Sequence, residues 1–176
     1  MEILGPEDAG LMLRYQEKNR AHLSPWEPLR EAAFFTPTHW QNQLQENRDL
    51  FNMGTAFRFS ALAQDRSEII GLCNFTNVIH GVFQACNLGY SVAEKYQGQG
   101  LMQEILEAGI AYMFEVVGMH RIMANHLPRN HRSEKLLSRL GFEREGLARS
   151  YLMIAGRWED HILNSKINPR DDLSKG

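Results

Sequence analysis

The stretch that decides the fold is LGYSVAEKYQGQGLM, residues 88–102, because the spacing of its apolar side chains changes halfway along it. Over residues 86–92 apolar side chains alternate with small or polar ones, which is the spacing of a β-strand. From residue 101 to 117 they recur every three or four positions, which is the spacing of one helix face. Gln97-Gly98-Gln99-Gly100 lies between the two. The sequence therefore predicts a strand, a glycine-containing turn and a helix.

Such a junction suits a phosphate or pyrophosphate. The first N–H groups of a helix have no intrahelical partner, and the helix dipole favours an anion beside them. Gly98 and Gly100 would let the backbone approach a ligand closely. The stretch has no P-loop lysine and no dinucleotide-binding fingerprint. We therefore expect backbone amides to hold any anion here, although a turn that binds nothing is the alternative.

A second helix is predicted over residues 130–140. Asn130 suits the N-cap position, and three leucines at 136, 137 and 140 form an apolar face. Gly141 follows as a stop signal.

The two stretches together resemble the GNAT acyltransferase superfamily. The family pattern Q/R-x-x-G-x-G/A is matched by residues 97–102, except that its last position is Met102. The later pattern N-x-x-S…GF is matched by Asn130, Ser133 and the pair Gly141-Phe142. Residues 25–28, 74–78, 120–125 and 139–143 further resemble the branch that acetylates the N-terminal alanine of a small-subunit ribosomal protein, the fifth. The resemblance covers nearly the whole chain.

The resemblance implies an α+β (mixed α/β) fold of the GNAT type. We expect a single domain over residues 1–168, followed by a polar tail at 169–176. Its twisted, mostly antiparallel sheet would be flanked by helices, and the strands at 88–92 and 121–127 would splay apart in the middle of the sheet. The remaining pattern of hairpins and strand–helix units agrees with a mixed sheet. Residues 21–31 are expected to form a loop, and His80-Gly81 a hairpin turn leading into a strand at 82–93.

The resemblance also implies acetyl-CoA as acetyl donor and direct attack by an amine in a ternary complex. The pantetheine arm would lie between the splayed strands, and the pyrophosphate would lie on the turn amides. The expected cofactor-binding residues are Leu88, Gly89, Tyr90, Ser91, Val92, Gln97, Gly98, Gln99, Gly100, Leu101, Met102, Asn130 and Ser133.

Three residues are candidates for catalysis. A backbone N–H at or beside Tyr90 would polarise the thioester carbonyl. Many family members carry a tyrosine acid four residues after the Ser/Ala position, but here that position is Leu137, so Ser133 is the expected substitute. Some relatives place a glutamate where this chain has Asn125, which could hold a proton-accepting water. Glu27 and His80 are other candidates for the base.

Four residues are candidates for acceptor binding. Trp26 and Glu27 lie in the expected loop, where recognition residues commonly occur. The alternative for Trp26 is packing over the edge of the core. Asn74 and Asn77 interrupt a strand and either line the acceptor site or bond to neighbouring backbone.

Composition limits the other functions. The chain has 176 residues, 43% hydrophobic and 23% charged, with a net charge of −2, so it has no overall basic field for nucleic acid. Contact with a ribosome would need protein or a local patch. No apolar run suits a membrane span, and the N-terminus does not resemble a signal peptide. Cys73 and Cys86 are expected to be reduced core residues of a cytoplasmic protein, and the seven histidines have no metal-binding spacing.

Three functions remain after this reasoning. The first is acetylation of a ribosomal protein's N-terminal alanine. The second is acetylation of a small amine, such as a polyamine or an antibiotic, because sites rather than folds set function. The third is a non-catalytic acetyl-CoA-binding module in ribosome assembly.

Overall fold

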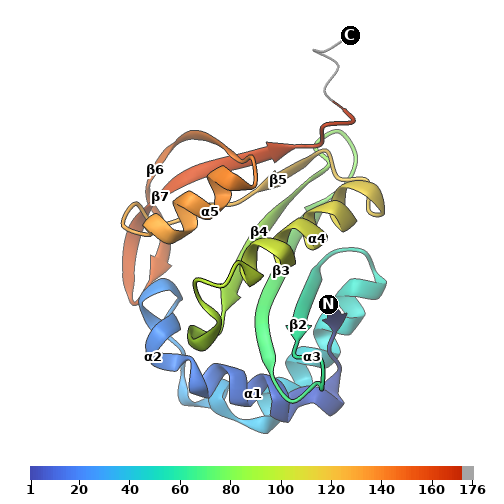
Figure 1. Ribbon diagram of the computed structural model, residues 1–176, viewed down its shortest axis with the longest axis vertical. Helices are drawn as coiled ribbons and strands as arrows, with labels where there is room; N and C mark the ends of the chain where they lie inside the picture. Colours follow the sequence, from blue (N-terminus) through green and yellow to red (C-terminus); the bar gives the residue numbers. More distant parts are fainter. Residues whose placement is uncertain (172–176) are drawn as a thin grey trace.

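The computed structural model describes residues 1–171 and places seven strands in one twisted sheet with helices on both faces (Figure 1). Residues 172–176 of the predicted tail lie outside the described part. The strand order is β1-β2-β3-β4-β5-β7-β6, and only the β4–β5 pair is parallel. The strands are β1 (Glu2–Ile3), β2 (Phe57–Leu62), β3 (Ile69–Ile79), β4 (Ala85–Val92), β5 (Arg121–Met123), β6 (Glu143–Ile154) and β7 (Arg157–Ile167). The predicted mixed, mostly antiparallel sheet is confirmed.

Within residues 1–171, five α-helices accompany the sheet. They are α1 (Ala9–Lys18), α2 (Arg20–Leu23), α3 (Pro37–Asn52), α4 (Leu101–Glu115) and α5 (His131–Arg139). The Asn130 side chain caps α5 as predicted, because its Oδ1 accepts the Ser133 N–H at 3.2 Å. Thr36 caps α3 in the same way through the N–H of His39. No helix in residues 1–171 combines the length and apolar character needed to cross a bilayer.

Strand alternation divides the sheet into two unlike faces. On β2 and β3, Phe57, Phe59, Cys73 and Phe75 belong to the large core that α4 covers. The intervening positions point to the opposite face, where α1 and α3 build a smaller core with Leu72. Because side chains on a strand alternate, polar residues between the buried phenylalanines all reach the α1–α3 face.

Three predicted boundaries are wrong. The strand predicted at 121–127 ends at Met123, because β4 turns away and leaves residues 124–126 bonded to β7 alone. The loop predicted at 21–31 begins with α2 and a 3-10 turn, Ser24–Trp26. The strand predicted from residue 82 begins at Ala85, so the hairpin turn is longer than His80-Gly81.

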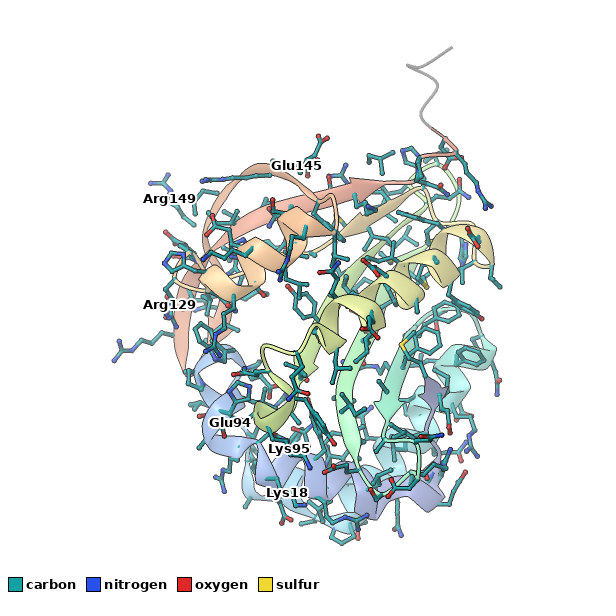
Figure 2. All side chains as sticks on the ribbon, in the orientation of Figure 1. Lys18, Glu94, Lys95, Arg129, Glu145 and Arg149 are labelled. Atoms are coloured by element: carbon teal, nitrogen blue, oxygen red, sulfur yellow. The ribbon has the colours of Figure 1, made fainter. Side chains whose placement is uncertain are left out.

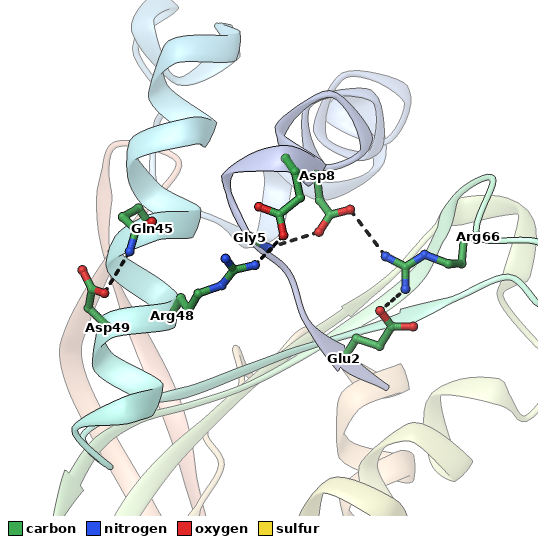
Figure 3. A network of polar contacts seen from close by, with 8 residues as sticks. Glu2, Gly5, Asp8, Gln45, Arg48, Asp49 and Arg66 are labelled. Carbon is green, nitrogen blue, oxygen red and sulfur yellow. Dashed lines mark hydrogen bonds and ion pairs between the residues drawn. The ribbon is translucent and has the colours of Figure 1, made fainter.

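Besides the pairing of β1 with β2 and the buried Leu4, polar contacts at the surface attach the N-terminal segment to the domain (Figure 3). The Gly5 N–H donates to Asp8 Oδ2 at 3.1 Å, and Arg48 of α3 pairs with Glu7 at 2.5 Å. Arg66 pairs with both Glu2 and Asp8. Because these groups are exposed, each ion pair contributes little to stability.

Helix α4 packs closely on β3 at Gly109. A Cβ on Gly109 would lie 2.7 Å from Cys73 Sγ and 3.1 Å from Phe75 Cε2, in a part of the core with no free volume. We expect Gly109→Ala to destabilise the protein by about 1–3 kcal/mol through overpacking, measured by thermal unfolding. Gly10→Ala is the matched control, since its Cβ would lie 3.5 Å from the flexible Arg14 side chain and alanine favours the helix. Equal unfolding temperatures for the two variants would contradict this packing argument.

Candidate active site

The centre of the candidate site is the gap between β4 and β5. The strands are paired from Ala85–Arg121 to Asn87–Met123 and diverge beyond that point (Figure 1). The Ala93 N–H donates to the Ile70 carbonyl at 2.9 Å, which fixes the alternation of bonded pairs between β3 and β4. By that alternation the N–H and C=O of Tyr90 point away from β3, into the gap. Buried backbone groups need partners, so an amide-bearing ligand suits this position.

The turn before α4 has the features of an anion cradle. Gly98 and Gly100 have φ of 73° and 81°, a region that favours glycine, and a Cβ on either would meet open space. Among the described residues, the amides from Gly98 to Met102 donate to no protein acceptor. These amides lie at the start of a helix of 15 residues. The cradle therefore fits the pyrophosphate of a coenzyme A.

A polar tie connects this turn to two helices. Arg132 of α5 donates to Gln97 Oε1 at 2.6 Å, and Gln97 Nε2 lies 3.0 Å from His22 Nε2 of α2. Sequence reasoning missed Arg132, although its place beside the cap residue Asn130 could have suggested it. The tie puts a guanidinium at the edge of the amide cradle.

Ser133 contacts Tyr90 at the position where β4 and β5 diverge. Its Oγ is 2.7 Å from Tyr90 Oη, and its backbone N–H is held by Asn130. Burial raises the pKa of the Tyr90 phenol to about 12, and the bond to Ser133 opposes this. Tyr90 is therefore a neutral hydroxyl at physiological pH, able to donate a hydrogen bond or relay a proton.

A cavity of about 390 Å³ covers the α1–α3 face of the sheet and reaches the gap, where Tyr90, Asn130 and Ser133 line it. Trp26, Glu27 and Asn74, which were predicted to bind the acceptor, also line the cavity, and their role in acceptor binding stays a prediction. Among its lining residues Glu27 is the single carboxylate, and it pairs with Arg30 at 3.4 Å.

Asn77 does not line the cavity. It lies three positions after Asn74, and a bulge in β3 at this point gives it φ of 51° and an exposed position. The bulge interrupts the regular alternation of side chains and leaves Asn77 exposed and outside the cavity lining, so the geometry gives no support to acceptor binding by Asn77.

The Trp26 loop lies at the rim of the cavity. Trp26 is 37% exposed, and the Arg129 guanidinium lies 5.9 Å from its ring centre. Arg129 projects from the side of the molecule formed by α5 and the last hairpin (Figure 2) and pairs with Glu159. The Glu27 carbonyl accepts the N–H of Ala155 at 2.9 Å, so the hairpin turn holds the loop in place.

Three side chains near the gap are candidates for handling a proton. Asn125 lines the cavity, but its Oδ1 accepts the Asn164 N–H at 3.3 Å and its Nδ2 lies 3.4 Å from Tyr151 Oη. His126 and His161 are buried there, with Nδ1 at 2.9 and 3.0 Å from backbone carbonyls. A carbonyl accepts only from a protonated nitrogen, so in each neutral ring Nε2 is the basic nitrogen.

Sequence reasoning did not single out either histidine for this role. Along β7 the buried residues come in adjacent pairs, His161 with Ile162 and Asn164 with Ser165, so a search for simple alternation would not have revealed His161. His80, in contrast, lies in an exposed turn against the Gly54 carbonyl and does not line the cavity.

The two cysteines have no place in the chemistry. Both are buried in the core under α4, and burial raises the pKa of both thiols, to about 12 for Cys86. A thiol in this state is a poor nucleophile. Within residues 1–171 no group of three or more His, Cys, Asp or Glu side chains is arranged to hold a metal ion.

Comparison with known proteins agrees with this geometry. The family described as "Acetyltransferase (GNAT) domain" matches residues 3–143. The chain is 46% identical over 169 residues, 96% of its length and 87% of the relative, to the [ribosomal protein uS5]-alanine N-acetyltransferase of Escherichia coli K12. The ribosomal-protein-S5-alanine acetyltransferase of Vibrio fischeri superposes with a TM-score of 0.92 at 43% identity, covering 97% of this chain and 92% of that one. Mycobacterium smegmatis RimJ, solved in complex with CoA-disulfide, gives 0.88 at 29%, covering 97% and 82%.

The amide cradle can be tested at Gly100. We expect Gly100→Ala to raise the KM for acetyl-CoA severalfold, because a Cβ would both strain the left-handed backbone and occupy space beside the amides. Gly54→Ala is the matched control, since Gly54 also has positive φ (69°) and open space around its Cβ but follows the end of α3 rather than preceding α4. Steady-state kinetics at a saturating acceptor concentration would give the KM for acetyl-CoA of each variant. A similar KM in both variants would show that this turn does not hold the coenzyme.

Proposed function

Because the chain belongs to the GNAT acetyltransferase family, we propose that it acetylates the N-terminal alanine α-amine of a ribosomal protein equivalent to uS5, with acetyl-CoA as donor. The observation that carries the proposal is 46% identity over 96% of the chain to an enzyme named for that reaction. The partner is then the N-terminus of a ribosomal protein in the cytoplasm, either free or in an assembling ribosome.

Acetyl-CoA supplies an activated acetyl group, and the residues of this chain fit its two ends. The free amides from Gly98 to Met102 suit the pyrophosphate, with Arg132 at their edge. The Tyr90 N–H, directed into the gap, can donate to a thioester carbonyl and stabilise the negative charge that develops on its oxygen. Acetyl-CoA and the acceptor would meet where the cavity reaches the gap between β4 and β5.

Ser133 and Tyr90 can protect the leaving sulfur from carrying a full charge. Ser133 Oγ holds a proton, and Tyr90 Oη at 2.7 Å can replace that proton from its own hydroxyl. This pair takes the role that a tyrosine at position 137 has in other family members. Leu137 is buried in the core under α5 and cannot take that role.

The attacking amine must first be neutral. An α-amino group has a pKa of about 7.7–8.0, so a substantial fraction is neutral near physiological pH and a strong base is not needed. The Nε2 atoms of His126 and His161, or a water beside Asn125, can accept the proton inside the cavity.

The charge of the cavity favours a peptide over a polyamine. A polyamine-binding pocket would need several carboxylates, whereas Glu27 alone lines this cavity and is already paired with Arg30. Arg58 adds a second cation. A purely structural, non-catalytic role would not need the bonded Tyr90–Ser133 pair.

The first test is acetyl transfer from acetyl-CoA to a short peptide that begins with alanine. A second peptide has its α-amine blocked and a lysine left free. We expect transfer to the free α-amine alone. Transfer to the lysine, or to spermidine but to neither peptide, would contradict the proposal.

The role of Ser133 gives a kinetic prediction. We expect Ser133→Ala to lower kcat by about 10- to 100-fold, below the upper range for general acids because Tyr90 remains, with little change in the KM for acetyl-CoA. Ser138→Ala, an exposed serine on the same helix, should keep the parent kcat. A raised KM with an unchanged kcat would instead make Ser133 a binding residue.

A further inference from the structure

At its β2–α3 end the cavity contains two hydrogen-bond donors that have no acceptor. Trp40 of α3 is 7% exposed, and its Nε1–H is buried and unpaired among the described residues. The Nε–H of Arg58 on β2 is also buried and unpaired. Both side chains line the cavity. We name the part of the cavity at Arg58 the Arg58 subsite.

The charge of Arg58 is not neutralised by a contact. Within residues 1–171 no carboxylate lies within ion-pair distance of its guanidinium. Burial lowers the pKa of Arg58, and the more distant Glu46 on α3 opposes this. Glu46 itself accepts a hydrogen bond from Gln43, which also donates to Asn47. The α3 side chains beside the subsite therefore bond to one another rather than to Arg58.

A buried donor without an acceptor loses its hydrogen bonds to bulk water and gains nothing in return. A ligand oxygen placed here would recover that loss. The planar guanidinium suits a carboxylate best, because it can donate two parallel bonds to the two oxygens.

Sheet register gives the distance from this subsite to the reaction centre. Arg58 is directly opposite Asn74 on β3, and Asn74 is directly opposite Gly89 on β4, next to Tyr90. Two strand spacings amount to roughly 10 Å. An extended peptide advances about 3.3 Å per residue, so a peptide with its first residue at β4 brings its second or third side chain within reach of the long Arg58 side chain.

We propose that the Arg58 subsite binds an acidic side chain at the second or third residue of the acceptor peptide. The inference rests on the proposed function and adds a sequence requirement to it. The enzyme then reads more of its acceptor than the alanine that it modifies.

The test uses amidated hexapeptides that begin with alanine, carry glutamate or glutamine at position two or three, and otherwise contain glycine and serine. We expect the parent enzyme to prefer glutamate by about tenfold or more in kcat/KM at one of the two positions, as for a hydrogen bond to a charged group. Arg58→Gln should abolish this preference, and Arg58→Lys should keep part of it. Arg48→Gln is the matched control, since it removes the same charge from α3 but at the exposed contact with Glu7.

A charge-reversal variant separates recognition from folding. Arg58→Glu should prefer lysine over glutamate at the same position, a gain that a misfolded protein cannot show. Equal kcat/KM for glutamate and glutamine in the parent enzyme at both positions would overturn the proposal. An equal loss of kcat/KM for every peptide in Arg58→Gln would also overturn the proposal. Arg58 would then contact the peptide backbone or stabilise the fold rather than bind an acidic side chain.

If the proposed acetyl transfer fails, the Arg58 subsite can still be tested by peptide binding. If no peptide is acetylated, calorimetric titration of the same peptides into the enzyme saturated with coenzyme A still measures the preference. Tighter binding of the glutamate peptide that depends on Arg58 would support the subsite. Equal binding of the glutamate and glutamine peptides would overturn it.

Discussion

The structure depends on the point at which β4 and β5 stop pairing. Up to Asn87 and Met123 the two strands share a parallel ladder, and beyond it each backbone continues without the other. A sheet normally satisfies its own N–H and C=O groups, so this divergence leaves Tyr90 with backbone groups directed at empty space. It also opens the sheet, so that the cavity on the α1–α3 face reaches Ser133 on the opposite side. The directed Tyr90 backbone, the end of the cavity and the bonded Tyr90–Ser133 pair all meet at this one break, which is where our proposal places the reaction.

The two faces of the sheet have separate tasks. The α4 face is packed so tightly that Gly109 has no room for a methyl group, which holds the amide cradle at the start of α4 in a fixed place. The α1–α3 face has polar residues, Arg58 between Phe57 and Phe59 and Asn74 between Cys73 and Phe75, whose own side chains are buried on the other face. A rigid support on one face and a polar cavity on the other follow from one alternating pattern.

The buried donors at the β2–α3 end of the cavity bear on its specificity for the acceptor. A large apolar pocket would accept many amines, whereas unpaired buried donors discriminate against ligands that leave them unpaired. Arg58 lies far along the chain from the glycine turn and the Asn130 cap, and the register of β2, β3 and β4 places it two strands from Gly89. Our proposal therefore assigns acceptor recognition to β2 and β3, and the coenzyme to the turn before α4 and the end of β4.

The sequence by itself determined the elements whose signals are local. The change of period at residues 88–102 and the Asn130 cap each depend on neighbouring residues, and both are present. The family resemblance brought together Tyr90, Ser133 and the glycine turn before any coordinates. Only the tertiary structure decided where β5 ends, that Asn74 lines the cavity and Asn77 does not, and that His126, His161, Arg132 and Arg58 surround the site. These depend on strand register, a bulge and the divergence of two strands, which are set by contacts between residues distant in the chain and leave no periodic trace in it.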